Sequence, residues 1–218
     1  ARSLGARALT VAAPYLGFMR QDLAFRPGEA VSQRIVGRFL AGLFDAVITV
    51  DPHLHRVATL QEAVPVARAV VLSGAPMLAE HFARVRGPVV LLGPDEEALQ
   101  WVASAASLHG WKHAVCRKTR HGDREVDIAL PDMALAGEAV VLIDDVASSG
   151  QTLVRAAELL KDAGARSVDV AVTHALLDEV ALERVHQAGV GAFWSTDAVA
   201  HPTNAVSIAA AVAGALRV

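Results

Sequence analysis

The sequence predicts an α/β protein whose parallel sheets are flanked by helices, and three observations lead to this fold class. Short apolar runs alternate with segments of helical periodicity along the 218 residues, which is the pattern of strand–helix–strand units. Hydrophobic residues make up 53% of the chain and charged residues 20%, as in a compact protein with a sizeable core. No low-complexity tract interrupts the alternation. The length suits one large domain or two small ones.

The individual elements follow from these patterns in chain order. Short apolar runs predict strands at 8–13, 46–50, 88–93, 113–117, 125–130, 139–144, 167–173 and 191–196. Amphipathic periodicity predicts helices at 29–44, 74–85, 96–109, 150–163, 178–188 and 205–216. Gly164 follows the fourth of these helices and is typical of a C-terminal stop.

A domain boundary is expected near residue 66. Residues 57–73 are apolar but lack a clear period, so no element is predicted there. The first domain would comprise residues 1–66 and the second residues 67–204. The C-terminal segment 205–218 is expected to pack on the first domain.

Composition excludes several classes of function. The net charge of −3 is close to neutral, and no basic stretch suggests a nucleic-acid surface. Cys116 is the single cysteine, so no internal disulfide can form, as is usual in a reducing compartment. No apolar run reaches the length of a membrane span, and the first residues lack the features of a signal peptide. We therefore expect a cytoplasmic protein that binds neither nucleic acid nor membrane.

The most informative segment is residues 139–152, which read AVVLIDDVASSGQT. An apolar strand ends in Asp144 and Asp145, whose oxygens can accept hydrogen bonds from the neighbouring hydroxyls of a sugar. A loop of small residues then leads into a helix, and its free N–H groups and hydroxyls suit a phosphate at the positive helix end. The predicted binding residues of this loop are Ala147, Ser148, Ser149, Gly150, Gln151 and Thr152.

This segment resembles the ribose-5-phosphate loop of the type I phosphoribosyltransferase fold. The Walker pattern of nucleoside triphosphatases does not occur in the chain. The resemblance implies that the two aspartates bind ribose and that residues 148–152 bind its 5-phosphate. The alternative is an ordinary strand–turn–helix unit in which Asp145 is only a cap.

Three further polar segments have two readings each when taken alone. Arg20, Gln21 and Asp22 lie in a long loop after a strand, where an arginine fork suits a nucleotide phosphate. His53 follows another strand and can bind a metal or a phosphate. Residues 117–120 read RKTR and form a basic run. The alternatives are a solvated surface loop for residues 20–22, an ordinary turn histidine for His53 and a solvated hairpin for residues 117–120.

Together these segments resemble the ribose-phosphate pyrophosphokinase family, in particular its short archaeal branch. The matching segments are residues 14–22 (PYLGFMRQD), 47–53 (VITVDPH), 117–120 (RKTR), 139–152 and 173–174 (TH). The resemblance implies tandem type I phosphoribosyltransferase-like domains, the first of them truncated at its N-terminus. It also implies a homodimer or a larger homo-oligomer.

The resemblance further implies substrates, a cofactor and residue roles. The family transfers the diphosphoryl group of ATP to the C1 hydroxyl of ribose 5-phosphate and releases AMP. Lys118 and Arg120 would be catalytic, and ATP would be bound by Arg20, Gln21, Asp22 and His53. Mg²⁺ would lie near His53 and Asp95.

Two positions depart from the family pattern. Glu97 stands where a glycine usually lets the backbone approach the pyrophosphate, and Leu23 stands where a basic residue is common. These departures leave open a non-catalytic or regulatory homologue. A phosphoribosyltransferase is a further alternative, although such enzymes lack the Arg20-Gln21-Asp22 and His53 segments.

Overall fold

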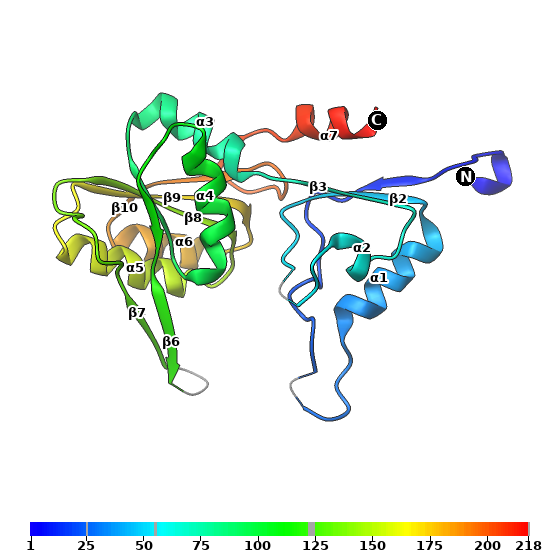
Figure 1. Cartoon of the computed structure of the whole chain (residues 1–218), viewed down its shortest axis with the longest axis horizontal. Helices are drawn as coiled ribbons and strands as arrows, with labels where there is room; N and C mark the ends of the chain where they lie inside the picture. The colour runs from blue at the N-terminus through cyan, green and yellow to red at the C-terminus, as the bar shows by residue number, and fades with distance from the viewer. Residues whose placement is uncertain (25, 55, 122–124, 218) are drawn as a thin grey trace. The chain divides into compact units, whose positions relative to one another are not determined.

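The computed structural model describes residues 1–24, 26–54, 56–121 and 125–217 (Figure 1). The chain forms two compact units. The first comprises Ala1–Leu72 together with Ile208–Val218, and the second comprises Ser73–Ser207. Each unit has its own parallel sheet with helices against it, which confirms the predicted fold class. Among the described residues, no helix has both the length and the hydropathy needed to cross a membrane.

The first unit is built on a three-stranded sheet of order β1-β2-β3. The strands are β1 (Thr10–Ala12), β2 (Ala46–Val50) and β3 (Arg68–Leu72), and both pairs are parallel. A 3₁₀ turn (Arg2–Leu4) precedes them, and the helices are α1 (Ser32–Leu43), α2 (Leu60–Ala63) and α7 (Ala209–Leu216). β2 is buried along its whole length because it lies between the other two strands.

The core of this unit joins the sheet to the loops and to α2. Val47 of β2 packs with Leu16, Met19, Leu60 and Val64. A Cβ atom at Gly37 would collide with the carbonyl oxygen of Ala63. Glycine therefore lets α1 approach the end of α2 directly.

The second unit is built on a six-stranded sheet of order β11-β10-β9-β8-β4-β5 in which all neighbours are parallel. The strands are β4 (Val90–Gly93), β5 (His113–Val115), β8 (Ala139–Ala147), β9 (Ser167–Ala175), β10 (Val190–Thr196) and β11 (Asn204–Val206). An antiparallel hairpin of β6 (Arg117–His121) and β7 (Glu125–Ala129) extends from this unit (Figure 1).

Helices cover both faces of the six-stranded sheet. Val140 and Leu142 of β8 face the core cluster that contains α5 (Gln151–Asp162) and α6 (Glu179–Gln187). Val141 and Ile143 face the opposite cluster, which contains α3 (Ala75–Arg86) and α4 (Leu99–Ser107). A short 3₁₀ turn, η2 (Glu96–Ala98), precedes α4. Because both faces are covered, β8 reads as a continuous apolar run.

Several predicted boundaries differ from the structure. The strand 113–117 splits into β5 and β6, the strand 139–144 continues to Ala147, and the helix 96–109 begins with the turn η2. The helix 205–216 begins at Ala209 because the preceding residues form β11 and pair with β10. The sequence patterns also missed α2, β3 and β11.

The pairing of β3 with β2 bears on the boundary between the units. Ala46 pairs with Arg68 and Val50 with Leu72, so β3 belongs to the first sheet. The contacts divide the chain between Leu72 and Ser73. α7 contacts β2 and β3, and Arg68 Nη2 donates a hydrogen bond to the carbonyl oxygen of Ala215 at 2.8 Å.

Candidate active site

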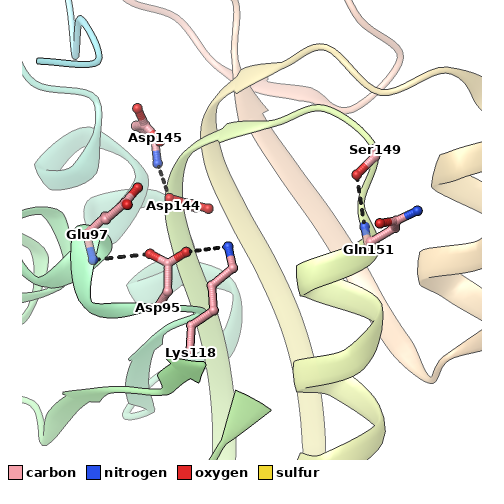
Figure 2. A network of polar contacts seen from close by, with 7 residues as sticks. All are labelled: Asp95, Glu97, Lys118, Asp144, Asp145, Ser149 and Gln151. Atoms are coloured by element: carbon pink, nitrogen blue, oxygen red, sulfur yellow. Dashed lines mark hydrogen bonds and ion pairs between the residues drawn. The ribbon is translucent and has the colours of Figure 1, made fainter. Parts of the chain in front are cut away.

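The carboxyl ends of two neighbouring strands place the acidic residues of the second unit together. β4 pairs with β8 in parallel, with Leu92 opposite Leu142. Asp95 follows β4, and Asp144 and Asp145 lie in the last part of β8. The carboxyl edge of a parallel sheet is where ligands bind in α/β folds. Figure 2 shows the three aspartates close to one another, with Lys118 of β6 beside them.

Asp95 has partners on both carboxylate oxygens. Its Oδ1 accepts a hydrogen bond from the backbone N–H of Glu97 at 3.1 Å and so caps the turn η2. Its Oδ2 accepts from Lys118 Nζ at 2.9 Å, and both side chains are largely buried, with 12% and 17% of their surfaces exposed. The pair holds an ammonium group at the acidic edge of the sheet.

The pKa of Asp144 is shifted by burial and by two neighbouring carboxylates. Burial of its carboxyl group, followed by the charges of Asp145 and Asp95, raises the pKa of Asp144 well above its usual range. One oxygen of Asp144 accepts from the backbone N–H of Asp145 at 2.9 Å. Asp145 itself is 2% exposed. A ligand with hydroxyl donors or positive charge would relieve this repulsion.

The loop after β8 presents backbone donors at the start of α5. Within the described part of the chain, the N–H groups of Ser148, Ser149 and Gly150 have no hydrogen-bond partner. The Oγ of Ser149 lies 3.5 Å from the backbone nitrogen of Gln151 (Figure 2). Orphan N–H groups at a helix N-terminus attract anions such as phosphate. These N–H groups lie in the loop that the sequence predicts to bind an anion, which stays a prediction.

Gly150 shapes this loop. It precedes the first residue of α5 and has a left-handed backbone with φ of 71°. A Cβ there would also lie 3.1 Å from Cγ2 of Val185. Glycine is the residue that adopts this conformation without strain. Ala147 is buried and Thr152 is half-buried, whereas Ser148, Ser149 and Gln151 are exposed.

The first unit carries the other predicted residues. Gln21 uses its side-chain amide to brace its own loop, since it donates to the carbonyl oxygen of Ala30 at 2.6 Å and accepts from the N–H of Ser32 at 2.7 Å. Asp22 is buried, and its Oδ1 accepts from Arg56 Nη1 at 2.8 Å. Arg20 is exposed and His53 is half-buried. Gln21 and Asp22 thus have internal partners, while the charged group of Arg20 faces solvent.

The basic run of residues 117–120 lies in β6. Lys118 pairs with Ile128 and Arg120 with Val126 across the hairpin. The side chain of Arg120 lies outside the part that the structure describes. Burial, and to a lesser degree the charge of Asp95, raises the pKa of the neighbouring Cys116 thiol to about 11. Cys116 is therefore a protonated core residue at neutral pH and not a nucleophile.

The two departures from the family pattern are visible in the structure. Glu97 is exposed in η2, and Figure 2 shows its side chain on the same side as the aspartates. Leu23 is half-buried. No group of three or more acidic, histidine or cysteine side chains is arranged to hold a metal among the described residues. A magnesium ion here would depend on phosphate oxygens and water for most of its ligands, as is common for this ion.

Sequence reasoning did not identify Arg56 as the partner of Asp22. The two residues are 34 positions apart, so no local pattern links them. Thr173 and His174, which lie in the fifth matching segment, are buried in β9 beside β8. They lie in the last part of β9, where His174 pairs with Val146 of β8.

The chain is similar in sequence to known proteins. A family model described as phosphoribosyl transferase domain matches residues 67–190. A ribose-phosphate pyrophosphokinase from Methanopyrus kandleri is 38% identical over 218 residues, which cover 99% of this chain and 74% of the relative. One from Methanothermobacter thermautotrophicus is 33% identical, with coverage of 99% and 74%.

A solved structure shows the same fold. The phosphoribosylpyrophosphate synthetase from Mycobacterium smegmatis superposes with a TM-score of 0.83 and is 24% identical in sequence. The match covers 99% of this chain and 72% of that protein.

Proposed function

The chain belongs to the ribose-phosphate pyrophosphokinase family, and we propose that it transfers the diphosphoryl group of ATP to ribose 5-phosphate and releases AMP. The observation that carries this proposal is the position of Lys118 beside Asp95 at the strand edge that also holds Asp144 and Asp145. The loop that we propose to bind phosphate continues directly from the same strand. A cation, two diol acceptors and an anion loop are the groups that this reaction requires.

Ribose 5-phosphate would lie along the end of β8. The carboxylates of Asp144 and Asp145 would accept hydrogen bonds from its ring hydroxyls. The free N–H groups of residues 148–150, with the hydroxyls of Ser148, Ser149 and Thr152, would bind its 5-phosphate. These contacts would fix the sugar so that its C1 hydroxyl faces the nucleotide.

The reaction forms a bond between the C1 oxygen and the β-phosphorus of ATP. The bond from that phosphorus to the oxygen shared with the α-phosphate breaks, AMP leaves with this oxygen, and the proton of the C1 hydroxyl is released to water. Negative charge grows on the β-phosphate oxygens and on the leaving oxygen. Lys118 would leave Asp95 to neutralise this charge, together with Arg120. Arg20 and His53 would contact the ATP, and Gln21 would hold the loop of Arg20 in place.

Magnesium fits the residues present. Asp95 supplies oxygen ligands of the kind that Mg²⁺ prefers, and it lies at the strand edge that also holds Asp144 and Asp145. When bound, Mg²⁺ would neutralise the phosphates of ATP, with Asp95 and His53 nearby. We also propose that the chain forms a homodimer or a larger homo-oligomer. Analytical ultracentrifugation measures the oligomeric state.

The proposal is tested by incubation of the chain with ATP, ribose 5-phosphate and Mg²⁺. We expect equal amounts of AMP and 5-phosphoribosyl 1-pyrophosphate, measured by anion-exchange chromatography. Omission of ribose 5-phosphate should abolish AMP release. Release of ADP or inorganic phosphate in place of AMP would contradict diphosphoryl transfer.

Replacement of Glu97 by Gly is expected to raise kcat/KM for ATP several-fold. The exposed carboxylate lies beside the proposed phosphates, and two exposed like charges near the surface repel by about 1 kcal/mol. Steady-state kinetics at fixed ribose 5-phosphate measures the effect. Glu96→Gly is the matched control because Glu96 is the adjacent exposed glutamate of the same turn. An equal gain in both variants would indicate a general effect of charge or backbone freedom.

A further inference from the structure

An ion pair in the first unit joins two loops that carry the proposed ATP residues. Asp22 lies in the loop after β1, just beyond Arg20, and Arg56 lies in the loop after β2, just beyond His53. β1 and β2 are parallel neighbours, so both loops leave the sheet at the same edge. Arg56 Nη1 and Asp22 Oδ1 are 2.8 Å apart.

The two partners differ sharply in exposure. The side chain of Asp22 is 4% exposed, whereas that of Arg56 is 57% exposed. The second oxygen of Asp22, Oδ2, is also buried and has no partner among the described residues. A buried carboxylate is unfavourable unless a cation lies against it. Asp22 therefore fixes one nitrogen of a guanidinium whose remainder reaches solvent.

A guanidinium held in this way is prepared for an anion. Arginine has five N–H donors in a planar fork, and the recorded bond to Asp22 uses Nη1. The other donors can contact phosphate oxygens without a further loss of side-chain freedom, because the buried carboxylate already restricts the rotamer. The exposed surface of Arg56 thus has both the charge and the geometry of a phosphate ligand.

We propose that Arg56 binds the polyphosphate chain of the nucleotide and that Asp22 is its positioning residue. This inference rests on the proposed use of ATP and extends it to a residue outside the matching segments. It assigns Asp22 an indirect role: its carboxylate orients Arg56 and does not contact the nucleotide. Ribose 5-phosphate is a less suitable ligand for Arg56, because the anion loop at α5 already provides donors for its phosphate.

The test measures nucleotide binding separately from turnover. Wild-type, Arg56→Ala, Arg56→Lys and Asp22→Asn chains are titrated with Mg²⁺-ATP in the absence of ribose 5-phosphate by isothermal calorimetry. Arg56→Ala is expected to raise the Kd for ATP about 10- to 100-fold, the loss typical of a charge-assisted hydrogen bond. Arg56→Lys, which keeps the charge but loses the fork, should show a smaller increase.

A double-mutant cycle tests the positioning role. Asp22→Asn should weaken ATP binding less than Arg56→Ala, and the double variant should bind no more weakly than Arg56→Ala alone. The KM for ribose 5-phosphate should stay within twofold in all of them. The control is the exposed pair of Arg2 and Asp45 in the same unit, whose charged atoms are 2.9 Å apart and whose side chains are 50% and 41% exposed. Arg2→Ala and Asp45→Asn should leave the Kd for ATP unchanged.

Each outcome decides the inference. If Arg56→Ala lowers the melting temperature but leaves the Kd for ATP unchanged, the pair only stabilises the loops and the proposal is wrong. If additive losses occur for Asp22→Asn and Arg56→Ala, Asp22 contacts the nucleotide itself and its positioning role is wrong. Because calorimetry reports binding, a wild-type chain that binds ATP but releases no AMP would overturn the proposed reaction and not the role of Arg56.

Discussion

Replacement of Lys118 by Ala is expected to lower kcat by about 10²- to 10³-fold, the range for loss of one preorganised group that stabilises transition-state charge. Lys118 Nζ lies 2.9 Å from Asp95 Oδ2 at the acidic end of the sheet. In the proposed reaction this ammonium group meets charge that develops on the phosphates only as the bond to AMP breaks. An interaction made mainly in the transition state lowers kcat more than it raises KM.

The measurement separates chemistry from binding. Steady-state AMP release gives kcat, and calorimetry gives the Kd for ribose 5-phosphate, which should change little because its proposed contacts come from β8 and α5. Lys112→Ala is a suitable control, since the side chain of Lys112 is 69% exposed and pairs with Glu138 away from the three aspartates. A fully active Lys118→Ala chain would contradict the proposal that Lys118 of β6 takes part in catalysis.

The Lys118→Ala variant also tests the ion pair that Lys118 forms with Asp95 in the ligand-free chain. Without Lys118, Asp95 keeps only the hydrogen bond from Glu97 N–H among the bonds described here for its carboxylate. Lys118→Arg retains the charge but changes its geometry. If catalysis depends on a compact, mobile cation, this variant should recover only part of kcat while it keeps the stability of the wild-type chain.

The sequence predicted some elements well because their local patterns and tertiary roles agree. β2 has the predicted bounds, 46–50, since a fully buried central strand is also a continuous apolar run. The start of the strand at residue 139 and the start of the helix near residue 150 were predicted for the same reason, although the strand continues to Ala147. Each residue there has a local signal: apolar residues for the strand, glycine for the left-handed turn and hydroxyl residues at the helix start.

Other features depend on partners that local patterns do not encode. β6 is a polar run that becomes a strand through pairing with β7, and β11 is an edge strand defined by its bonds to β10. β3 shows no regular alternation, because four of its five residues are partly buried and only Val71 is exposed. In the loop after β1, the sequence indicated polar binding residues, but only the fold shows that Gln21 braces Ala30 and Ser32 and that Asp22 holds Arg56.

Replacement of Asp144 by Asn is expected to stabilise the ligand-free chain at neutral pH while it weakens the binding of ribose 5-phosphate. The folded-state pKa of Asp144 is raised above its usual 3.8 by burial and by Asp145 and Asp95. The fold therefore favours the protonated form. The contribution of Asp144 to the free energy of unfolding is fully present at a pH below its usual pKa. It is lost as the pH rises through the raised pKa of the folded state. Asparagine has nearly the same shape and does not ionise.

The same substitution should reduce ligand affinity. A carboxylate accepts hydrogen bonds on both oxygens, whereas an amide offers only one acceptor. Hydrogen bonds to a charged group contribute about 1.5–3 kcal/mol, so the Kd for ribose 5-phosphate should rise about 10- to 100-fold. Calorimetry with ribose 5-phosphate measures this loss, and urea unfolding at several pH values measures the stability.

The pH series distinguishes repulsion from a simple packing effect. Wild-type and Asp144→Asn chains should have similar free energies of unfolding at low pH, and the difference should grow in favour of the variant as pH rises. Asp132→Asn, at an exposed position of the same unit, should show no such trend. A variant that is less stable than wild type at neutral pH would mean that the charged form of Asp144 is stabilised in the fold. A gain in stability with a loss of affinity would show that the acidic pair is kept for its ligand, because only the ligand's hydroxyl donors would offset the repulsion that the fold leaves at this strand edge.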